Sequence, residues 1–180
     1  MSIYVALLRG INVGGRNLVA MPGLCDLFGT LGLTGARSLL QSGNLVFQSQ
    51  GRTGAMLERL LEVETEMRLE VPVAYFVRSR DEWRAIVAGN PFPEAAERDP
   101  SHLVVLFVKE APSAKAMKAL QAAIKGPEIV GSKGKQVYLV YPAGIGRSKL
   151  THTLIEKKLG TRGTGRNWNT VLKLAELLQE

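Results

Sequence analysis

The order of apolar and polar patterns along the chain constrains its fold more than any other feature. Within residues 2–79, four segments have strand patterns, at 2–9, 36–41, 44–48 and 71–77. A helical pattern at 21–31 lies between the first and second strand segments, and another at 53–69 lies between the third and fourth. The resulting βαββαβ order is typical of the split βαβ, or ferredoxin-like, arrangement. We therefore predict an α+β protein whose first unit, residues 1–79, is ferredoxin-like.

The second half of the chain repeats most of this order. Strand patterns at 102–109, 128–130 and 136–141 surround a helical pattern at 112–124, and helices are expected at 148–159 and 166–178. We assign no fourth strand, so residues 102–180 are predicted to form a related βαββα unit with two terminal helices. Residues 80–101 are expected to connect the units through a short helix at 81–89.

Composition supports a folded protein and narrows its chemistry. The 180 residues are 46% hydrophobic and 22% charged, which suits one domain or two small ones. The single cysteine, Cys25, excludes an internal disulfide and lies on an expected helical face, which favours a core thiol over a nucleophile. His102 and His152 have no ligand-spaced partner, so we expect no metal site. No motif indicates a cofactor.

The N-terminal segment does not resemble a signal peptide. It lacks a basic start, and Arg9 interrupts its apolar run. No segment approaches the roughly 20 apolar residues that a membrane-spanning helix requires. We therefore expect a cytoplasmic, bacterial-type protein without a membrane partner.

Positive charge is concentrated in the second half. Residues 1–90 contain nine basic and eight acidic residues, whereas residues 91–180 contain fourteen and eight. Between Lys133 and Lys173 there are nine basic residues and one acid, Glu156. A local excess of this kind indicates binding of anions such as nucleotides or nucleic acid. A solvated basic face is the alternative interpretation.

The first polar motif follows the first strand. Residues 10–17 have the glycine spacing of a phosphate-binding loop, but Arg16 and Asn17 replace the lysine and the magnesium-binding hydroxyl. This excludes an ordinary P-loop ATPase. Arg9, Asn12, Arg16 and the backbone N–H groups near Gly14 remain candidates for an anion site, and a plain glycine-rich turn is the alternative.

The second motif is Gln41-Ser42-Gly43-Asn44, for which a tight hairpin turn is the favoured interpretation. Ser42 has no candidate base next to it in sequence and no nucleophile-elbow pattern around it, so acyl transfer is poorly supported.

The third and fourth motifs are expected to begin helices. In Gly144-Ile145-Gly146-Arg147-Ser148-Lys149, a glycine loop opens a helix with Ser148 as its N-cap. Residues 161–170 form the densest polar run of the chain and introduce the last helix. For the third motif a capped helix start without a ligand is the alternative, and for the fourth the alternative is a buried network of polar side chains.

The four motifs contain no Asp, Glu or His, so they lack the groups of general acid–base catalysis. Their cations and hydrogen-bond donors suit a phosphate group. We assign no catalytic residue. The candidate ligand-binding residues are Arg9, Asn12, Gly14, Ser42, Asn44, Arg147, Ser148, Lys149, Arg166, Asn167, Asn169 and Thr170.

Taken in this order, the motifs resemble a bacterial family known as domain of unknown function 1697. The resemblance rests on residues 9–15, Gln41-Ser42-Gly43-Asn44, Asn90-Pro91-Phe92, Ser148-Lys149-Leu150-Thr151 and Arg166-Asn167-Trp168-Asn169-Thr170-Val171. It spans nearly the whole chain and implies a compact α+β fold with ferredoxin-like character. It implies no activity.

These observations lead to three hypotheses. The leading one is a protein that binds a phosphate-bearing ligand, a nucleotide or a nucleic acid, through basic, glycine-led helix starts. The alternatives are an enzyme acting on a phosphorylated small molecule and a purely structural network of polar side chains. The sequence predicts no oligomeric state.

Overall fold

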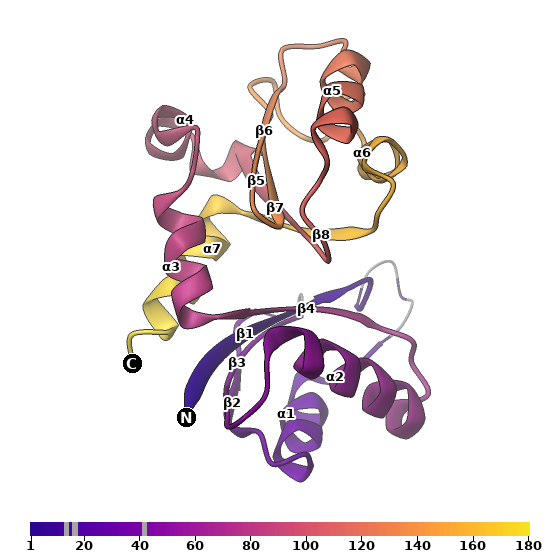
Figure 1. The fold of residues 1–180 in the computed structure, drawn as a ribbon, viewed down its shortest axis with the longest axis vertical. Coiled ribbons are helices and arrows are strands. Elements are labelled where there is room, and N and C mark those ends of the chain that lie inside the picture. Colours follow the sequence, from indigo (N-terminus) through magenta and orange to yellow (C-terminus); the bar gives the residue numbers. More distant parts are fainter. Residues whose placement is uncertain (13–14, 16–17, 41–42) are drawn as a thin grey trace. The chain divides into compact units, whose positions relative to one another are not determined.

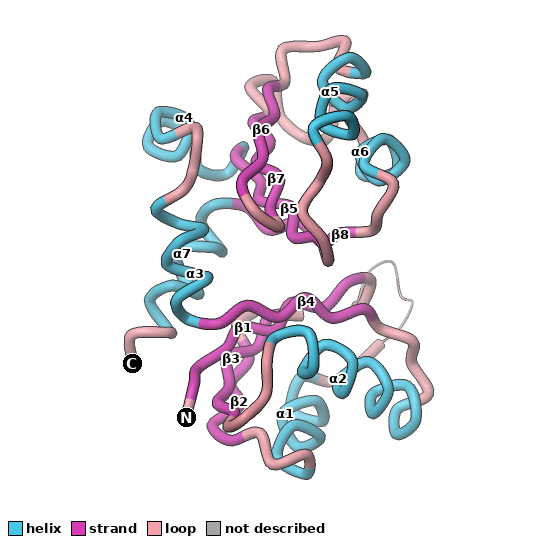
Figure 2. Tube along the Cα trace, in the orientation of Figure 1, coloured by secondary structure: helices cyan, strands magenta, loops and turns pink. Residues whose placement is uncertain are grey.

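The computed structural model describes residues 1–12, 15, 18–40 and 43–180, and the chain divides into two compact units. The first comprises Met1–Ala85 and Leu174–Glu180, and the second comprises Ile86–Lys173. The division passes within α3 (Arg80–Ala88) and within α7 (Trp168–Leu177). Each unit contains one four-stranded antiparallel sheet with helices packed on it (Figures 1 and 2).

The elements of the first unit follow the order predicted from the sequence. They are β1 (Ser2–Arg9), α1 (Met21–Thr30), β2 (Thr34–Ser38), β3 (Asn44–Ser49), α2 (Gly54–Leu69) and β4 (Ala74–Ser79). The strand order in the sheet is β2-β3-β1-β4. Alternate residues of β1, Tyr4, Ala6 and Leu8, lie on one face and join a buried cluster with Leu24 of α1 and Leu57 of α2.

Helix α2 also satisfies the exposed edge of this sheet. β4 is an edge strand, so alternate N–H groups of its backbone have no neighbouring strand. Glu62 accepts a hydrogen bond from Tyr75 N at 2.9 Å, and Glu58 accepts one from Val77 N at 2.9 Å. Glutamates four residues apart share a helical face. α2 is therefore held on the sheet by polar as well as apolar contacts.

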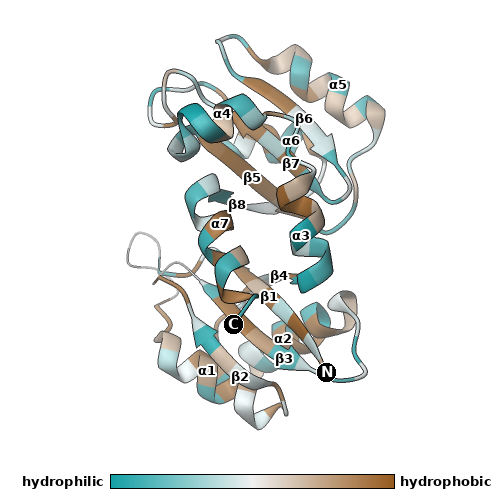
Figure 3. Cartoon of the chain, turned by 90° about the vertical axis from the view of Figure 1, so that its left-hand side faces the viewer, coloured by the Kyte–Doolittle hydropathy of each residue, from teal (hydrophilic) through white to brown (hydrophobic). Residues whose placement is uncertain are grey.

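The second unit contains a more complete sheet than the sequence predicted. Its elements are α4 (Pro93–Arg98), the 3-10 helix η1 (Pro100–His102), β5 (Leu103–Val108), α5 (Ala114–Ala123), β6 (Ile129–Lys133), β7 (Gln136–Val140), α6 (His152–Leu159) and β8 (Gly163–Asn167). The strand order is β6-β7-β5-β8. β5 is apolar along its whole length (Figure 3) and lies between two neighbouring strands.

The predicted βαββα order of this unit was therefore wrong at its end, because β8 adds the fourth strand. β8 reads Gly-Thr-Gly-Arg-Asn and has no apolar alternation, so its sequence gives no strand signal. Its conformation comes from antiparallel pairing with β5, from Val104 opposite Asn167 to Val108 opposite Gly163. The pairing supplies the backbone hydrogen bonds of a strand that the local sequence does not predict.

Both predicted helix starts were also wrong by a few residues. α6 begins at His152, and its N-cap is Thr151, whose hydroxyl accepts a hydrogen bond from Leu154 N at 3.2 Å. Ser148 is not a helix cap. α7 begins at Trp168, and Asn167 Oδ1 accepts a hydrogen bond from Thr170 N at 3.0 Å. Neither helix is therefore capped by a glycine-led turn, since Thr151 caps α6 and the last residue of β8, Asn167, caps α7.

The connecting segment is more helical than predicted. α3 at Arg80–Ala88 agrees with the expected helix at 81–89, but α4 follows it after only a short turn. Pro93 is the first residue of α4, a position where its missing N–H costs no helical hydrogen bond. The connecting segment therefore contains a second helix that the sequence analysis did not predict.

Close packing at Gly163 gives a test of the β5–β8 pairing. A Cβ atom at Gly163 would lie 2.8 Å from the carbonyl oxygen of Phe107 and 2.9 Å from the side chain of Leu106. We expect Gly163→Ala to lower the free energy of unfolding by about 1–3 kcal/mol, measured by chemical denaturation. Gly146→Ala is the control, because a Cβ there meets no heavy atom within 4 Å. Equal effects of the two substitutions would contradict the packing described.

Candidate functional site

In the first motif, the structure describes Arg9, Asn12 and the contacts of the Asn12 side chain. Arg9 is the last residue of β1, and Asn12 has a left-handed backbone with φ of 54°. The Asn12 side chain accepts a hydrogen bond from Val19 N at 2.8 Å and donates one to Val19 O at 3.0 Å. This amide therefore ties Asn12 to the backbone of Val19, seven positions further along the chain. Gly14, Arg16 and Asn17 lie outside the described residues.

The second motif lies against the first. Gly43 accepts a hydrogen bond through its carbonyl oxygen from Leu8 N at 2.9 Å. A Cβ atom at Gly43 would come within 3.0 Å of Leu8 and 3.1 Å of Ile11, and its φ of +81° favours glycine. Asn44 is fully buried and donates to the carbonyl oxygen of Leu39 at 3.0 Å. Ser42 lies outside the described residues.

The third and fourth motifs meet at one pocket in the second unit. This sheet–α6 pocket has a volume of about 510 Å³. Its floor is the face of the sheet that carries Val104, Leu139 and Asn167, which lie side by side on β5, β7 and β8. The residues that line it are Val104, Leu106, Leu139, Tyr141, Ile145, Gly146, Ser148, Leu150, Thr151, His152, Ile155, Gly165 and Asn167.

Two carboxylates hold polar side chains of this pocket. Ser148 donates a hydrogen bond to Glu128 Oε1 at 2.5 Å, and its hydroxyl accepts one from Leu150 N at 3.0 Å. His152 Nε2 lies 2.6 Å from Glu156 Oε1, one helical turn further along α6. An imidazole thus lines the pocket, and two acids contact its lining residues from behind, although the four motifs themselves contain none of these groups.

Tyr141 adds a buried phenol to the same pocket. It is 4% exposed and donates a hydrogen bond to the carbonyl oxygen of Leu150 at 3.2 Å. Burial, with a smaller contribution from the charge of Glu128, raises the pKa of Tyr141 to about 12. The phenol is therefore a neutral hydrogen-bonding group at ordinary pH.

Other predicted residues lie beside the pocket without lining it. Arg147 and Lys149 are exposed and alternate with the lining residues of their loop. Arg166 lies on the opposite face of β8 from Asn167, since neighbouring residues of a strand point to opposite faces. The structure therefore brings Ser148 and Asn167 together but separates them from Arg166.

Arg166 donates hydrogen bonds to two uncharged groups of its own strand. Its guanidinium donates to Thr164 Oγ1 at 2.7 Å and to the carbonyl oxygen of Gly165 at 2.8 Å. Burial lowers the pKa of Arg166 to about 10, so the side chain remains charged at neutral pH. Asn169 is exposed, and Thr170 is almost fully buried in the first turn of α7.

Sequence reasoning missed Tyr141, Glu128 and His152 as parts of this site. The four-residue spacing of His152 and Glu156 was the one available signal, because such pairs share a helical face. Glu128 and Tyr141 are brought close by strand pairing between β6 and β7, which no local pattern reveals.

Cys25 does not have the environment of a reactive thiol. It is half-buried, and burial, followed by the charge of Asp26, raises the pKa of its thiol. Among the described residues, no group of three or more His, Cys, Asp and Glu side chains is arranged to hold a metal ion. Over the same residues, no helix is both long enough and apolar enough to cross a membrane.

Comparison with known proteins identifies the family of this chain. Residues 1–138 match a family described as "Protein of unknown function (DUF1697)". The chain belongs to this family. A solved structure of a conserved bacterial protein from Streptococcus pneumoniae resembles this DUF1697 protein with a TM-score of 0.77. The two are 24% identical over 98% of each chain, a likeness of fold alone. A comparison with curated protein sequences finds no significant match.

Asn12 gives a test of the first motif. We expect Asn12→Gly to lower the free energy of unfolding by about 1–2 kcal/mol, because the left-handed backbone is retained while the bonds to Val19 are lost. Asn12→Ala should cost about 1 kcal/mol more, since alanine disfavours that backbone. Denaturant titration measures both. Equal stability of the alanine variant and the unmodified protein would contradict the loop geometry.

Tyr141 gives a prediction about alkaline pH. Its pKa in the folded protein lies above the value of roughly 10 in an unfolded chain. Its contribution to stability is therefore complete below about pH 10 and is lost as the pH rises through about 12. We expect Tyr141→Phe to reduce the free energy of unfolding at neutral pH. Between about pH 10 and 12 the variant should lose less stability than the unmodified protein, which denaturation followed by circular dichroism measures. Parallel curves for the two proteins would contradict burial of the phenol.

Proposed function

We propose that the second unit of this DUF1697 protein binds a phosphate-bearing small molecule in the sheet–α6 pocket. The observation that carries the proposal is that the N-cap residues of two helices, Thr151 of α6 and Asn167 of α7, both line this pocket. Helix N-termini carry partial positive charge and orient N–H groups outward, which favours anions. The helix starts are displaced from the predicted positions, but both border one cavity.

The charges around the pocket also support an anionic ligand. Arg147 and Lys149 lie on the loop that forms its rim, and His152 lines it directly. The neighbouring acids are already engaged, Glu128 by Ser148 and Glu156 by His152. Neither of these carboxylates is among the residues that line the pocket, so neither borders the space proposed for the phosphate.

The apolar floor favours an organic phosphate over the free ion. Val104, Leu106 and Leu139 supply a surface on which a base or another apolar body can rest. A volume of about 510 Å³ is within the range of roughly 300–1,000 Å³ typical of small-molecule sites. These features favour a nucleotide-sized molecule over an extended nucleic acid, which needs an open basic surface.

Calorimetric titration with nucleoside monophosphates and with inorganic phosphate, at low and high salt, tests the proposal. We expect His152→Asp to weaken nucleotide binding by about tenfold or more, because it places a negative charge in the pocket. Thr153→Asp is the matched control, since it adds the same charge to the first turn of α6 at an exposed position that does not line the pocket.

Three results would count against this function. They are no binding of any phosphate ester at low salt, equal weakening by the two aspartate variants, and tight binding of oligonucleotides alone. The last of these would favour a nucleic-acid partner on the basic surface.

A second candidate function is catalysis on the same ligand, because His152 of the pocket wall lies against the carboxylate of Glu156. An imidazole 2.6 Å from a carboxylate has the arrangement of many general bases. If this holds, phosphorus NMR of nucleotides incubated with the protein will show turnover that His152→Asn abolishes. An unchanged spectrum over the same period would contradict catalysis and support binding as the only function of the pocket.

We also interpret both units as ferredoxin-like. This interpretation is supported by the βαββαβ order of elements in each unit and by their equivalent strand orders, β2-β3-β1-β4 and β6-β7-β5-β8. In this view the two units are structural repeats that differ in the loops around their last strands.

A further inference from the structure

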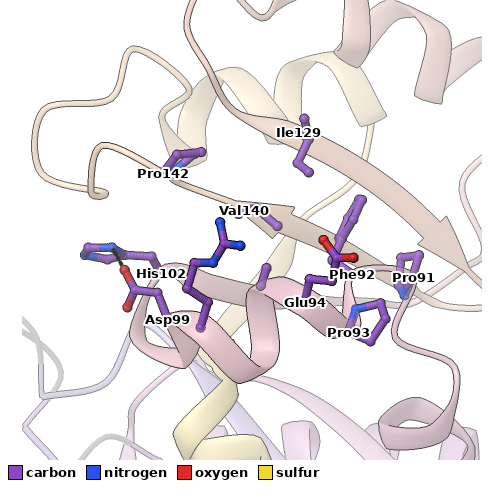
Figure 4. A pocket seen from close by; sticks show the side chains of 11 residues that line it. Pro91, Phe92, Pro93, Glu94, Asp99, His102, Ile129, Val140 and Pro142 are labelled. Carbon is purple, nitrogen blue, oxygen red and sulfur yellow. Dashed lines mark ion pairs between the residues drawn. The ribbon is translucent and has the colours of Figure 1, made fainter.

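A second pocket lies on the other face of the second sheet. This α4 pocket has a volume of about 570 Å³ (Figure 4). Val140 of β7 lines it, whereas the preceding residue, Leu139, lines the sheet–α6 pocket. The two cavities are therefore separated by the sheet itself. The lining residues are Pro91, Phe92, Pro93, Glu94, Ala95, Arg98, Asp99, His102, Ile129, Val140 and Pro142.

The segment before α4 builds the apolar end of this pocket. Asn90 Oδ1 accepts a hydrogen bond from Phe92 N at 2.9 Å, and Asn90 Nδ2 donates to Phe92 O at 3.3 Å. This clamp holds the Phe92 ring against β6, where a Cβ atom on Gly131 would lie 3.3 Å from it. Phe92, Ile129 and Val140 then present an apolar wall to a ligand.

The opposite end of the pocket contains an engaged acid. Asp99 Oδ2 lies 2.6 Å from His102 Nδ1, and Asp99 Oδ1 accepts a hydrogen bond from Ser101 at 2.8 Å. Figure 4 shows this pair at the end away from Phe92. One carboxylate oxygen of Asp99 therefore accepts a hydrogen bond, the other lies close to His102, and His102 forms part of the wall.

Two opposite charges remain on α4. Glu94 and Arg98 both line the pocket and are exposed, and their four-residue spacing places them on one face of the helix. Side chains at this spacing commonly form an ion pair. Here neither makes a side-chain hydrogen bond or ion pair with any residue that the structure describes. One carboxylate and one guanidinium thus border an apolar cavity without neutralising each other.

We propose that the α4 pocket binds a zwitterionic α-amino acid with an apolar side chain. Arg98 holds the ligand carboxylate, for which a guanidinium supplies paired donors, and Glu94 accepts hydrogen bonds from the ammonium group. The apolar side chain of the ligand lies on Phe92, Ile129 and Val140. A phosphate dianion suits this pocket poorly, because Glu94 and Asp99 supply more negative charge than Arg98 offsets.

Titration calorimetry with L-phenylalanine and L-leucine tests this site. We expect saturable binding, and Glu94→Gln and Arg98→Gln should each weaken it by about tenfold or more. Glu97→Gln is the matched control, because Glu97 is exposed on the same helix but does not line the pocket. Unchanged melting temperatures of the three variants will show that they fold.

Ligand analogues identify which groups are recognised. N-acetyl-L-phenylalanine lacks the ammonium charge, L-phenylalaninamide lacks the carboxylate, and glycine lacks the apolar body, so each should bind at least about tenfold more weakly than L-phenylalanine. Equal binding of any of these analogues would overturn the proposal. So would the absence of amino-acid binding at millimolar concentration, or an equal loss with Glu97→Gln. His152→Asp should leave this binding unchanged, so this site and the phosphate site can fail independently.

Discussion

The pairing of β8 with β5 is the interaction on which the candidate site of this protein depends. It places Asn167 beside Val104 and Gly165 beside Leu106, which forms the floor of the sheet–α6 pocket. It also sets the point at which α7 begins, because Asn167 ends the strand and caps the helix. A shift of one residue in this register would direct Arg166 into the pocket and Asn167 out of it. The close approach of Gly163 to Phe107 O disfavours such a shift.

Much of the polar chemistry in this chain holds its backbone in place. Asn12, Asn44 and Asn90 each bond to backbone groups of their own loops. Glu58 and Glu62 satisfy the edge of the first sheet. These contacts support the structural hypothesis for several motif residues, because a buried polar group without a partner is costly. The phosphate proposal consequently rests on the second unit, where polar side chains line a cavity.

The first unit was largely predictable, because its central strands are short, continuous apolar runs and its helices have apolar faces. Thr53 also caps α2 at the predicted boundary, with its hydroxyl accepting a hydrogen bond from Met56 N. The second unit was predictable up to β7. Beyond it, the polar run at residues 161–170 has two glycines and two asparagines, which fit a loop, a cap or an edge strand equally well. Only the presence of an apolar neighbour, β5, makes part of this run a strand.

The sequence by itself determined the alternation of strands and helices, the exclusion of a disulfide and the family to which the chain belongs. These follow from local patterns and residue types. The tertiary structure decided which polar groups meet. It placed Glu128 on Ser148 across twenty positions of sequence and set His152 opposite Asn167 in one pocket. It also left Glu94 and Arg98 unpaired beside an apolar wall. Contacts of this kind depend on strand register and helix position, and no local pattern encodes either.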